Sequence, residues 1–488
     1  MRHTPTCNSL FIGDFFINIV SRKRKYFYVR QTPNSLFLGD VLINASRVEY
    51  NQDNGVNITY DGGWRIFNRS SFSYNYGHGI NMTFNQTSID NRTRYTRHQK
   101  TEISRSSFIL NDGNGVRIGN YCQAARAVVN DSTFISNQLP AVEYFSCFKL
   151  IPDQNVTNFT VGYCTFDNNH EHAIKVTPLI NTVGLIANNT FSGHSKYVLL
   201  LDNTDDFLKN YFFQNLMVSY EVTGNRFVDN RGYYVANLRL TQWSQRQQLF
   251  FRYNVFTGNL IQGNNATLNE RTRAYAVVIL SSSNVIFVRN HLENPGSRYE
   301  LATYLVDLSV YINATMQWWG TVDYTQVIER IFDQYSRYNL AKIVYHPALS
   351  QSWLWTPVLT DRNIALEVEF LRGNKLGGRL SKELHLPPGQ TYYVDRDMSV
   401  LNFGLLYVTE NTRIEFENGL GMLVENYVNF LGSADNPIIL TLYNESTWIN
   451  SSVIRLVDGP SLLEGRLEVR PTEDDEWGTV CLDVSVKL

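Results

Sequence analysis

Side chains that could bind a metal ion or transfer protons stand close together at His170, Glu171 and His172, shortly after Asp167. Alternation along an extended chain would put both imidazoles on one face and the Glu171 carboxylate on the other. Two imidazoles without a third protein ligand nearby make an incomplete zinc site. We therefore predict no metal and no cofactor, and interpret these residues as solvated loop residues.

Two further motifs could belong to a polysaccharide-cleaving site. The chain contains Gly77-His78-Gly79 and Asn203-Thr204-Asp205-Asp206. Similar motifs occur in polygalacturonase-like hydrolases, but there the Asn-Thr-Asp and Asp-Asp motifs come before Gly-His-Gly. Acid–base cleavage of a glycosidic bond needs its two carboxyl groups within about 10 Å of each other. Whether these groups meet depends on the fold that carries them.

The fold can be inferred from a recurring Ser/Asn-x-Phe unit. Its anchors are Phe72, Phe108, Phe134, Phe166, Phe191, Phe227 and Phe256, with Leu292 as a variant. The intervals between anchors run from 25 to 36 residues. Such self-similarity is typical of solenoids. A leucine-rich-repeat solenoid has a regular, Leu-rich unit, whereas these anchors are Phe at irregular spacing, so we predict an all-β, right-handed parallel β-helix of the pectin-lyase-like class.

Polar residues recur at fixed offsets from the anchors. Three residues after the anchors stand Asn75, Asn111, Asn137, Asn169, Asn230 and Asn259, with His194 and Pro295 at the other two places. Two residues before the anchors stand Ser70, Ser106, Ser132, Cys164, Asn189, Asn225, Asn254 and Asn290. Asn tolerates the left-handed conformation of tight turns, and stacked amides can hydrogen-bond to one another. We predict that the Asn residues after the anchors turn the chain and form a structural ladder.

This fold separates the two candidate catalytic motifs. Gly77-His78-Gly79 precedes Asp205 and Asp206 by four coils, or about 20 Å at about 4.8 Å per coil. We therefore predict that the chain is not an enzyme. The alternative is a carbohydrate-active β-helix enzyme, a polysaccharide hydrolase or lyase, which would need two or three carboxylates that converge from neighbouring coils.

Composition restricts the class of protein. Hydrophobic residues make up 43% and aromatic residues 13% of the 488 residues, which excludes a largely disordered chain. Charged residues make up 18% and the net charge is −2, so nothing indicates a nucleic-acid partner. Asn is unusually frequent, with 50 residues spread along the chain.

The Asn residues also indicate the compartment. Fourteen stand in Asn-x-Ser/Thr sequons, about twice the number expected by chance, which favours a glycosylated extracellular chain although Asn- and Thr-rich strands create sequons too. The predicted glycosylation sites are Asn44, Asn57, Asn68, Asn81, Asn85, Asn91, Asn130, Asn155, Asn158, Asn188, Asn265, Asn313, Asn444 and Asn450. No apolar run reaches 18 residues and no convincing signal peptide is present. We expect a fragment of a longer secreted or membrane-anchored protein.

The chain divides into segments by composition. Residues 1–34 form an uncertain N-terminal coil, or an error in the gene model, because Asn8–Asn18 is nearly repeated at Asn34–Asn44. Residues 35–321 form the β-helix, and apolar spacing at Val327, Ile328, Ile331, Phe332 and Tyr335 predicts a capping helix within 322–350, with Asp323 or Thr325 as N-cap. A connector spans 351–376, and short apolar strands over 377–450 begin a second β-helix.

The tail, residues 453–488, resembles the first third of a scavenger receptor cysteine-rich domain. The resemblance lies in Ile454–Pro460, Glu464–Val469 and Glu476–Cys481, but the family's later cysteines are missing, so its ligand and calcium sites are not carried over. With the Trp318-Trp319-Gly320-Thr321 ending, the whole arrangement resembles large membrane-anchored animal proteins of epithelial tricellular junctions. That resemblance implies adhesion or junction organisation at the cell surface, with junctional or cell-surface proteins or glycans as partners.

Five cysteines remain to be placed. Cys122 and Cys147 follow their anchors by 14 and 13 residues, so they take nearly equivalent places in adjacent coils. Adjacent coils are close enough for a disulfide, which leads us to predict a Cys122–Cys147 bond, or else free thiols at Cys122, Cys147 and Cys164. Cys164 takes the small polar place before Phe166, where we expect a buried free thiol. Cys481 would pair outside this chain.

Overall fold

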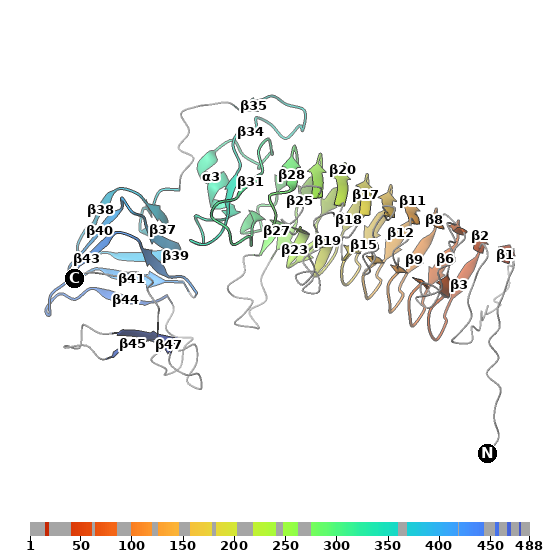
Figure 1. Cartoon of the computed structure of the whole chain (residues 1–488), viewed down its shortest axis with the longest axis horizontal. Coiled ribbons are helices and arrows are strands. Elements are labelled where there is room, and N and C mark those ends of the chain that lie inside the picture. Colours follow the sequence, from red (N-terminus) through yellow and green to blue (C-terminus); the bar gives the residue numbers. More distant parts are fainter. Residues whose placement is uncertain are drawn as a thin grey trace, which may run out of the picture.

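The first block of the molecule consists of three parallel sheets that stack coil upon coil. The computed structural model describes residues 15–18, 41–60, 64–84, 99–119, 125–145, 157–177, 182–202, 218–240, 247–261, 275–359, 368–417, 419–443, 454–457, 466–469 and 478–479. Each coil contributes one strand to each sheet, and the coils follow one another along the long axis (Figure 1). This arrangement is a parallel β-helix and confirms that part of the prediction.

Each sheet takes its strands from successive coils. Sheet 1 contains β1 (Phe15–Asn18), β2 (Val41–Asn44), β5 (Trp64–Asn68), β8 (Gln99–Ser104), β11 (Ala125–Asn130), β14 (Thr157–Gly162), β17 (Thr182–Ala187), β20 (Val218–Thr223), β24 (Gln247–Arg252) and β28 (Val285–Val288). Sheet 2 contains β3 (Arg47–Glu49), β6 (Ser71–Ser73), β9 (Ser107–Ile109), β12 (Thr133–Ile135), β15 (Thr165–Asp167), β18 (Thr190–Ser192), β21 (Arg226–Val228), β25 (Val255–Thr257) and β29 (His291–Glu293). Sheet 3 contains β4 (Val56–Tyr60), β7 (Ile80–Phe84), β10 (Val116–Gly119), β13 (Val142–Phe145), β16 (Ile174–Val176), β19 (Tyr197–Asp202), β23 (Tyr234–Arg239), β27 (Ala276–Leu280), β30 (Tyr299–Ala302) and β32 (Ile331–Phe332).

The Phe anchors form a continuous stack inside sheet 2. Phe72 pairs in register with Phe108, and the stack continues anchor by anchor to Phe256, which pairs with Leu292. Neighbouring ring centroids lie 4.5–5.1 Å apart, and all the anchors are fully buried. The three-residue strands turn only the central Phe inward, so each coil buries one aromatic ring at the same height.

A ladder of Asn side chains runs beside this stack. The side-chain Nδ2 donates to the Oδ1 of the next coil from Asn51 to Asn75, Asn111, Asn137 and Asn169, and again from Asn230 to Asn259 and Asn294, at 2.7–2.9 Å. At the gap stands His194, whose backbone N–H donates to Asn230 Oδ1 at 3.2 Å. In the last coil the ladder position is Asn294, one residue earlier than the spacing predicted.

A second ladder occupies the positions two residues before the anchors. In the earlier coils the backbone N–H donates to the next serine hydroxyl, from Ser46 to Ser70, Ser106 and Ser132. In the later coils amides take over, from Asn189 through Asn225 and Asn254 to Asn290 and then Gln317. Cys164 joins the two halves, since its backbone N–H donates to Asn189 Oδ1 at 2.9 Å. The buried serine and amide side chains at these positions are thus paired from coil to coil.

The left-handed backbone conformation does not fall on the ladder Asn residues, contrary to our expectation. It falls one residue earlier, for example at Tyr74 (φ 56°), Leu110 (φ 53°) and Ser136 (φ 53°). The reason is that the turn must be completed before the next residue can aim its amide along the stack. The outward-facing residue therefore bears the strained conformation, and the following Asn is free to pair.

Residues 322–350 do not form the capping helix that we predicted. Only α3 (Tyr324–Glu329) is helical, with Asp323 as N-cap through a hydrogen bond from the Thr325 N–H to its side chain. Ile331 and Phe332 form β32 instead, which pairs with Leu301 and Ala302 and extends sheet 3. Unpaired backbone groups at the end of sheet 3 favour a strand there over further helix, because a strand satisfies them directly.

Two pairs of short strands end the first block, and two sheets form the second. β31 (Tyr311–Asn313) pairs with β33 (Lys342–Val344), and β34 (Ala348–Leu349) pairs with β35 (Val358–Leu359). The second block contains a sheet of β36 (Leu371–Arg372), β37 (Lys375–Leu380), β39 (Thr391–Val400), β41 (Arg413–Phe416) and β44 (Ile439–Leu442), with β42 (Met422–Val424) against β39. A second sheet contains β38 (Glu383–Leu386), β40 (Leu405–Thr409) and β43 (Tyr427–Leu431).

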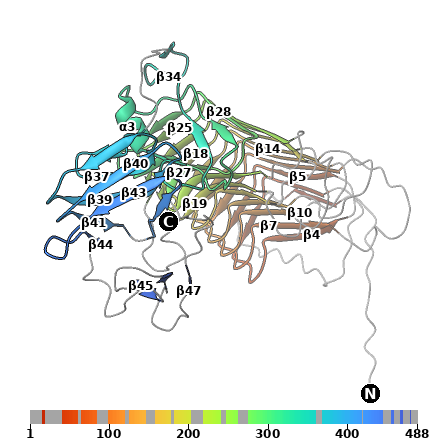
Figure 2. The same cartoon turned by 60° about the vertical axis from the view of Figure 1, so that its left-hand side comes forward.

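The second block is β-helical as well. β38, β40 and β43 pair in parallel at offsets of 22 residues, as Glu383 with Leu405 and Leu405 with Tyr427. It has its own core, which includes Leu376, Val394 and Ile414. Two views place β37 and β39 next to α3 of the first block (Figures 1 and 2).

The remaining described residues lie in the tail. β45 (Ile454–Val457), β46 (Arg466–Val469) and β47 (Gly478–Thr479) form a small antiparallel sheet.

The first block has two further strands, β22 (Arg231–Gly232) and β26 (Leu260–Ile261), which pair in parallel. Within the described ranges, no helix is long and apolar enough to cross a membrane.

Candidate functional site

The Gly-His-Gly motif holds neighbouring coils together. His78 Nδ1 accepts the Asn114 N–H at 2.8 Å, and the His78 N–H donates to Asn54 Oδ1 at 2.8 Å. A Cβ on Gly79 would lie 2.6 Å from the carbonyl oxygen of Gly115, so only glycine permits this close stacking. Partial burial, aided by the charge of Arg117, lowers the pKa of His78. The motif therefore has a structural explanation, while Asp205 and Asp206 lie outside the described residues.

His170 and His172 do not share a face. His170 is exposed, whereas His172 is 7% exposed, and its Nε2 lies 2.8 Å from the Tyr234 hydroxyl. Burial lowers the pKa of His172 to about 3, with the Lys175 charge acting in the same direction. Our interpretation of all three as solvated loop residues was wrong for His172. The chain is not a regular strand here, and the His172 ring stacks on the Tyr197 ring with the ring centroids 4.7 Å apart.

Glu143 of β13 is a nearly buried acidic side chain of sheet 3. Its neighbours in register are Arg117 and Lys175, with Lys175 Nζ at 3.0 Å and Arg117 Nε at 3.6 Å from its carboxylate. Asn114 Nδ2 also donates to it at 3.3 Å. Glu143 thus stands between two cations rather than beside a second carboxylate. Over the described part of the chain, no three His, Cys, Asp or Glu side chains gather as a metal site would require.

Glu329, the last residue of α3, connects the two blocks. Its Oε1 lies 2.7 Å from Arg372 Nη1 and its Oε2 lies 2.8 Å from Arg396 Nη2, and both arginines belong to the second block. Partial burial would raise the pKa of Glu329, but the charges of Arg396 and Arg372 outweigh it and hold that pKa below its usual range. A carboxylate at a helix C-terminus is unfavourable by itself, so these arginines supply the compensation.

Asp397 makes a second connection from the other side. Its carboxylate lies 3.2 Å from Arg337 Nη1 and accepts the N–H of Gly421 at 2.9 Å, while its own N–H donates to Ser336 O at 3.0 Å. Arg337 also donates to the carbonyl of Gly419. Since Asp397 is 5% exposed, this group links the blocks through shielded rather than surface charges.

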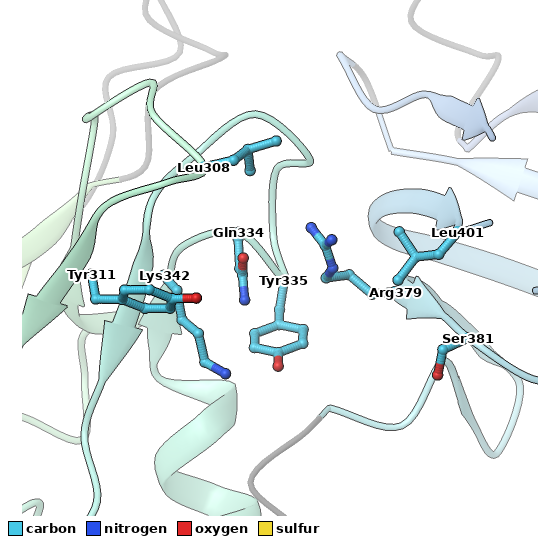
Figure 3. A pocket seen from close by; sticks show the side chains of 8 residues that line it. All are labelled: Leu308, Tyr311, Gln334, Tyr335, Lys342, Arg379, Ser381 and Leu401. Carbon is cyan, nitrogen blue, oxygen red and sulfur yellow. The ribbon is translucent and has the colours of Figure 1, made fainter. Parts of the chain in front are cut away.

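A cavity of about 320 Å³ lies between the same two blocks. It is lined by Leu308, Tyr311, Gln334, Tyr335, Lys342, Arg379, Ser381 and Leu401. The end of the first block forms one wall and the first coil of the second block forms the other (Figure 3). Arg379 extends from the second block toward Gln334 and Tyr335, and Lys342 lies over the Tyr335 ring with Nζ 5.8 Å from its centroid (Figure 3). This cavity is the candidate functional site.

Sequence patterns did not predict this cavity or the contacts around it. Glu329 and Arg396 are 67 residues apart, and nothing in either local pattern marks them as partners. The nearest signal was the change from Phe-anchored coils to a new strand-rich stretch, because ligand sites often form where two structural units meet. That change predicted the boundary between the two blocks but not the side chains that line the cavity.

The predicted glycosylation sites fall at several places. Exposed side chains stand at Asn57, Asn158, Asn188 and Asn313, and partly exposed ones at Asn44, Asn68, Asn81 and Asn130. Asn85, Asn91, Asn155, Asn265, Asn444 and Asn450 lie outside the described residues. In three sequons the hydroxyl belongs to Ser46, Ser70 or Ser132 of the second ladder, which bonds back to the carbonyl of its own Asn. The coil geometry therefore explains part of the sequon excess.

Among the described residues the cysteine that can be placed is Cys164. It is a free thiol, 2% exposed, and its Sγ lies 3.2 Å from the carbonyl of Gly162. Burial raises the pKa of Cys164 to about 12. The predicted partners Cys122 and Cys147 lie outside the described residues, as do Cys7 and Cys481, so the disulfide stays a prediction.

Comparison with known proteins shows one homologous relation. The chain is 30% identical over 451 residues to Protein bark beetle of Drosophila melanogaster, and the alignment covers 81% of this chain and 14% of that protein. The chain is therefore homologous to a segment of bark beetle and spans a small part of its length. No family model matches the chain, and no solved structure matches it.

Proposed function

We propose that this chain is an extracellular adhesion or junction-organising module of epithelial cell contacts. The observation that carries the proposal is the homology to bark beetle over 81% of the chain. The architecture that we described from the sequence resembles that of proteins at tricellular junctions. Its partners would be junctional or cell-surface proteins and glycans, within a membrane-anchored parent protein.

The geometry supports this role through rigidity. The first block has one continuous aromatic stack and two ladders, and ion pairs at the half-exposed Glu329 and the buried Asp397 fix the second block to it. A rigid, elongated body can present binding surfaces at set distances from a membrane, and preorganised surfaces lose less entropy on binding. We also propose that residues 453–488 begin a scavenger receptor cysteine-rich domain, which the tail motifs support.

A localisation assay tests the proposal. The chain would be displayed on epithelial cells through an unrelated membrane anchor and a fluorescent label, in cells depleted of their own relative of bark beetle. We expect enrichment at vertices where three cells meet, compared with two-cell borders. The same anchor carrying an unrelated β-solenoid is the control. An even distribution along all borders would contradict a junctional role.

Catalysis is not part of the proposal. Glu143 stands between two cations, an arrangement suited to stability rather than to proton transfer. The test is turnover of pectin, chitin and glycosaminoglycan by the purified chain. We expect none. Measurable cleavage that disappears in Asp205→Asn or Asp206→Asn would replace the adhesion proposal with a carbohydrate-active enzyme.

A further inference from the structure

We propose that the cavity between the two blocks binds an acidic sugar residue, with the carboxylate placed between Lys342 and Arg379. The cavity is about 320 Å³, near the lower limit of ligand-binding pockets. This size suits one or two sugar rings rather than a long chain. The inference concerns the purified chain and stands independently of any role at cell contacts.

The charge of the cavity is the first argument. Two of its lining side chains are cations, Lys342 and Arg379, and none of them is a carboxylate. The acidic group behind the wall is Asp333, which is buried and accepts backbone N–H groups from Tyr335 and Ile343 at 3.0 Å each. Asp333 attracts Lys342 electrostatically from behind the wall but does not line the cavity, so the two cations face the cavity without a lining anion. An anionic ligand would complete the charge balance.

The two cations come from different blocks. Lys342 belongs to β33 and pairs in register with Tyr311, while Arg379 belongs to β37. The Tyr335 ring supports the Lys342 ammonium, with Nζ 5.8 Å from the ring centroid. The contacts of Glu329 and Asp397 fix the distance between the walls, so both cations are held in place before a ligand arrives.

The other lining groups distinguish a sugar from a simple acid. Tyr311 is 62% exposed and offers a ring face, against which the C–H groups of a pyranose can pack. Gln334 and Ser381 supply an amide and a hydroxyl from opposite walls (Figure 3), which can hydrogen-bond to sugar hydroxyls. An acidic peptide side chain would use the two cations but leave the ring, amide and hydroxyl without a role. The set as a whole therefore favours an acidic sugar.

Binding can be measured with the purified full chain. The probes are glucuronate and N-acetylneuraminate, with glucose as the neutral control, and the readouts are calorimetry and saturation-transfer NMR. We expect a Kd of about 1 mM for one of the acids, no binding of glucose, and weaker binding as salt rises. Lys342→Gln and Arg379→Gln should each weaken binding about tenfold, because each removes one charge-assisted contact.

Two further variants serve as controls for the position of the binding site. Arg47→Gln removes an exposed cation far from the cavity in β3 and should leave binding unchanged. Leu401→Trp fills the cavity without changing its charge and should abolish binding, while circular dichroism shows that the fold is intact. Binding that survives both Leu401→Trp and Arg379→Gln would overturn the proposed site. Binding of poly-glutamate without either sugar acid would overturn the ligand class, and no binding at about 10 mM of either acid would overturn the proposal itself.

Discussion

Asn294 donates both its backbone N–H and its side-chain Nδ2–H to the carboxylate of Glu300, each at 2.7 Å. In each linked step of the Asn ladder the backbone N–H and one Nδ2–H donate toward the following coil, while the other Nδ2–H donates back to the preceding coil, so the last amide needs an acceptor beyond it. A carboxylate supplies two acceptor oxygens, and the aligned N–H groups favour negative charge there, as at a helix N-terminus. Glu300 is fully buried, and Arg330 Nη2 balances its charge at 2.8 Å.

Glu300→Gln should destabilise the first block by about 3–5 kcal/mol, because Arg330 keeps its carbonyl acceptors but loses its ionic partner and the amide has a single oxygen for the two Asn294 donors. Chemical denaturation measures the free energy of unfolding. The double variant with Arg330→Gln should recover part of the loss. Glu293→Gln removes a half-exposed acid that pairs with His291 and should cost less than about 0.5 kcal/mol, while equal costs for both variants would contradict the role of Glu300.

Asn137→Val should cost about 1–3 kcal/mol, since it breaks the links to Asn111 and Asn169 and leaves their buried groups unpaired. Phe134→Ala should cost about 3–5 kcal/mol because it opens a cavity in the aromatic stack. Thermal unfolding of the two variants checks both values. Wild-type melting of either variant would show that the register described here is wrong.

His194→Asn should make the protein more resistant to acid. Burial lowers the pKa of His194 to about 4, although the Asn169 carbonyl opposes this shift. The unfolded chain binds a proton near pH 6.5, so the stability contributed by neutral His194 is complete above that pH and is lost as the pH falls toward 4. The loss amounts to about 3 kcal/mol for a shift of this size.

Urea titrations at pH 7.5 and pH 5 test this expectation. The variant should lose less stability than the wild type between the two pH values, and its Asn should connect Asn169 to Asn230 and complete the ladder. His172 still titrates in the variant, because burial lowers its pKa to about 3 as well. An unchanged pH dependence would show that His194 is not the titrating group.

Glu329→Gln should uncouple the two blocks. The lowered pKa of Glu329 means that its contribution is present at neutral pH and is lost as the pH falls through a value below its usual range. We expect calorimetry to show separate unfolding transitions and small-angle scattering to show a broader range of shapes, in the variant at pH 7 and in the wild type at pH 3. Glu417→Gln is the graded comparison, since Glu417 is similarly exposed and also contacts the first block, but through one longer contact, 3.4 Å from Arg298, so it should loosen the blocks less.

Non-reducing peptide mapping should find a Cys122–Cys147 link and an unmodified Cys164. The thiol of Cys164 is buried and its pKa is raised to about 12, so alkylation of the native protein should be slow and should become fast on unfolding. A Cys147–Cys164 link, or rapid alkylation of Cys122 and Cys147 without reductant, would contradict the pairing.

The sequence allowed the solenoid to be predicted because its strongest signals are local. Phe134 and Phe166 stand inward on three-residue strands, and each Asn three residues later shares that environment. The positions with a left-handed backbone conformation could not be predicted from the sequence, because residues as different as Tyr74, Leu110 and Ser136 occupy them on the exposed side. We predicted too long a helix after Asp323 because the apolar spacing of Ile331 and Phe332 also suits a buried edge strand.

Contacts between distant segments could not be predicted in the same way. The sequence around Arg372 and Arg396 does not distinguish them from other arginines. Only the packing of the second block against α3 makes them partners of Glu329. The cavity depends on the same packing. Its Lys342 and Arg379 stand on strands of different sheets, so their proximity follows from three-dimensional arrangement rather than from spacing along the chain.

The directionality of the Asn ladder also determines how such a protein can grow. Each ladder Asn accepts at Oδ1 from the coil before it, donates one Nδ2–H to the coil after it and donates the other to a carbonyl of the coil before it. A complete coil can therefore be gained or lost without orphaning a polar group, whereas half a coil cannot. The first strands fit this rule, since β1 pairs with β2 at an offset of 26 residues, as Phe15 with Val41, the same interval that separates the near-identical Asn8–Asn18 and Asn34–Asn44. Whole-coil duplication is thus the smallest length change that natural selection can accept in the stacked region, and variation of any other size belongs in the loops between the strands.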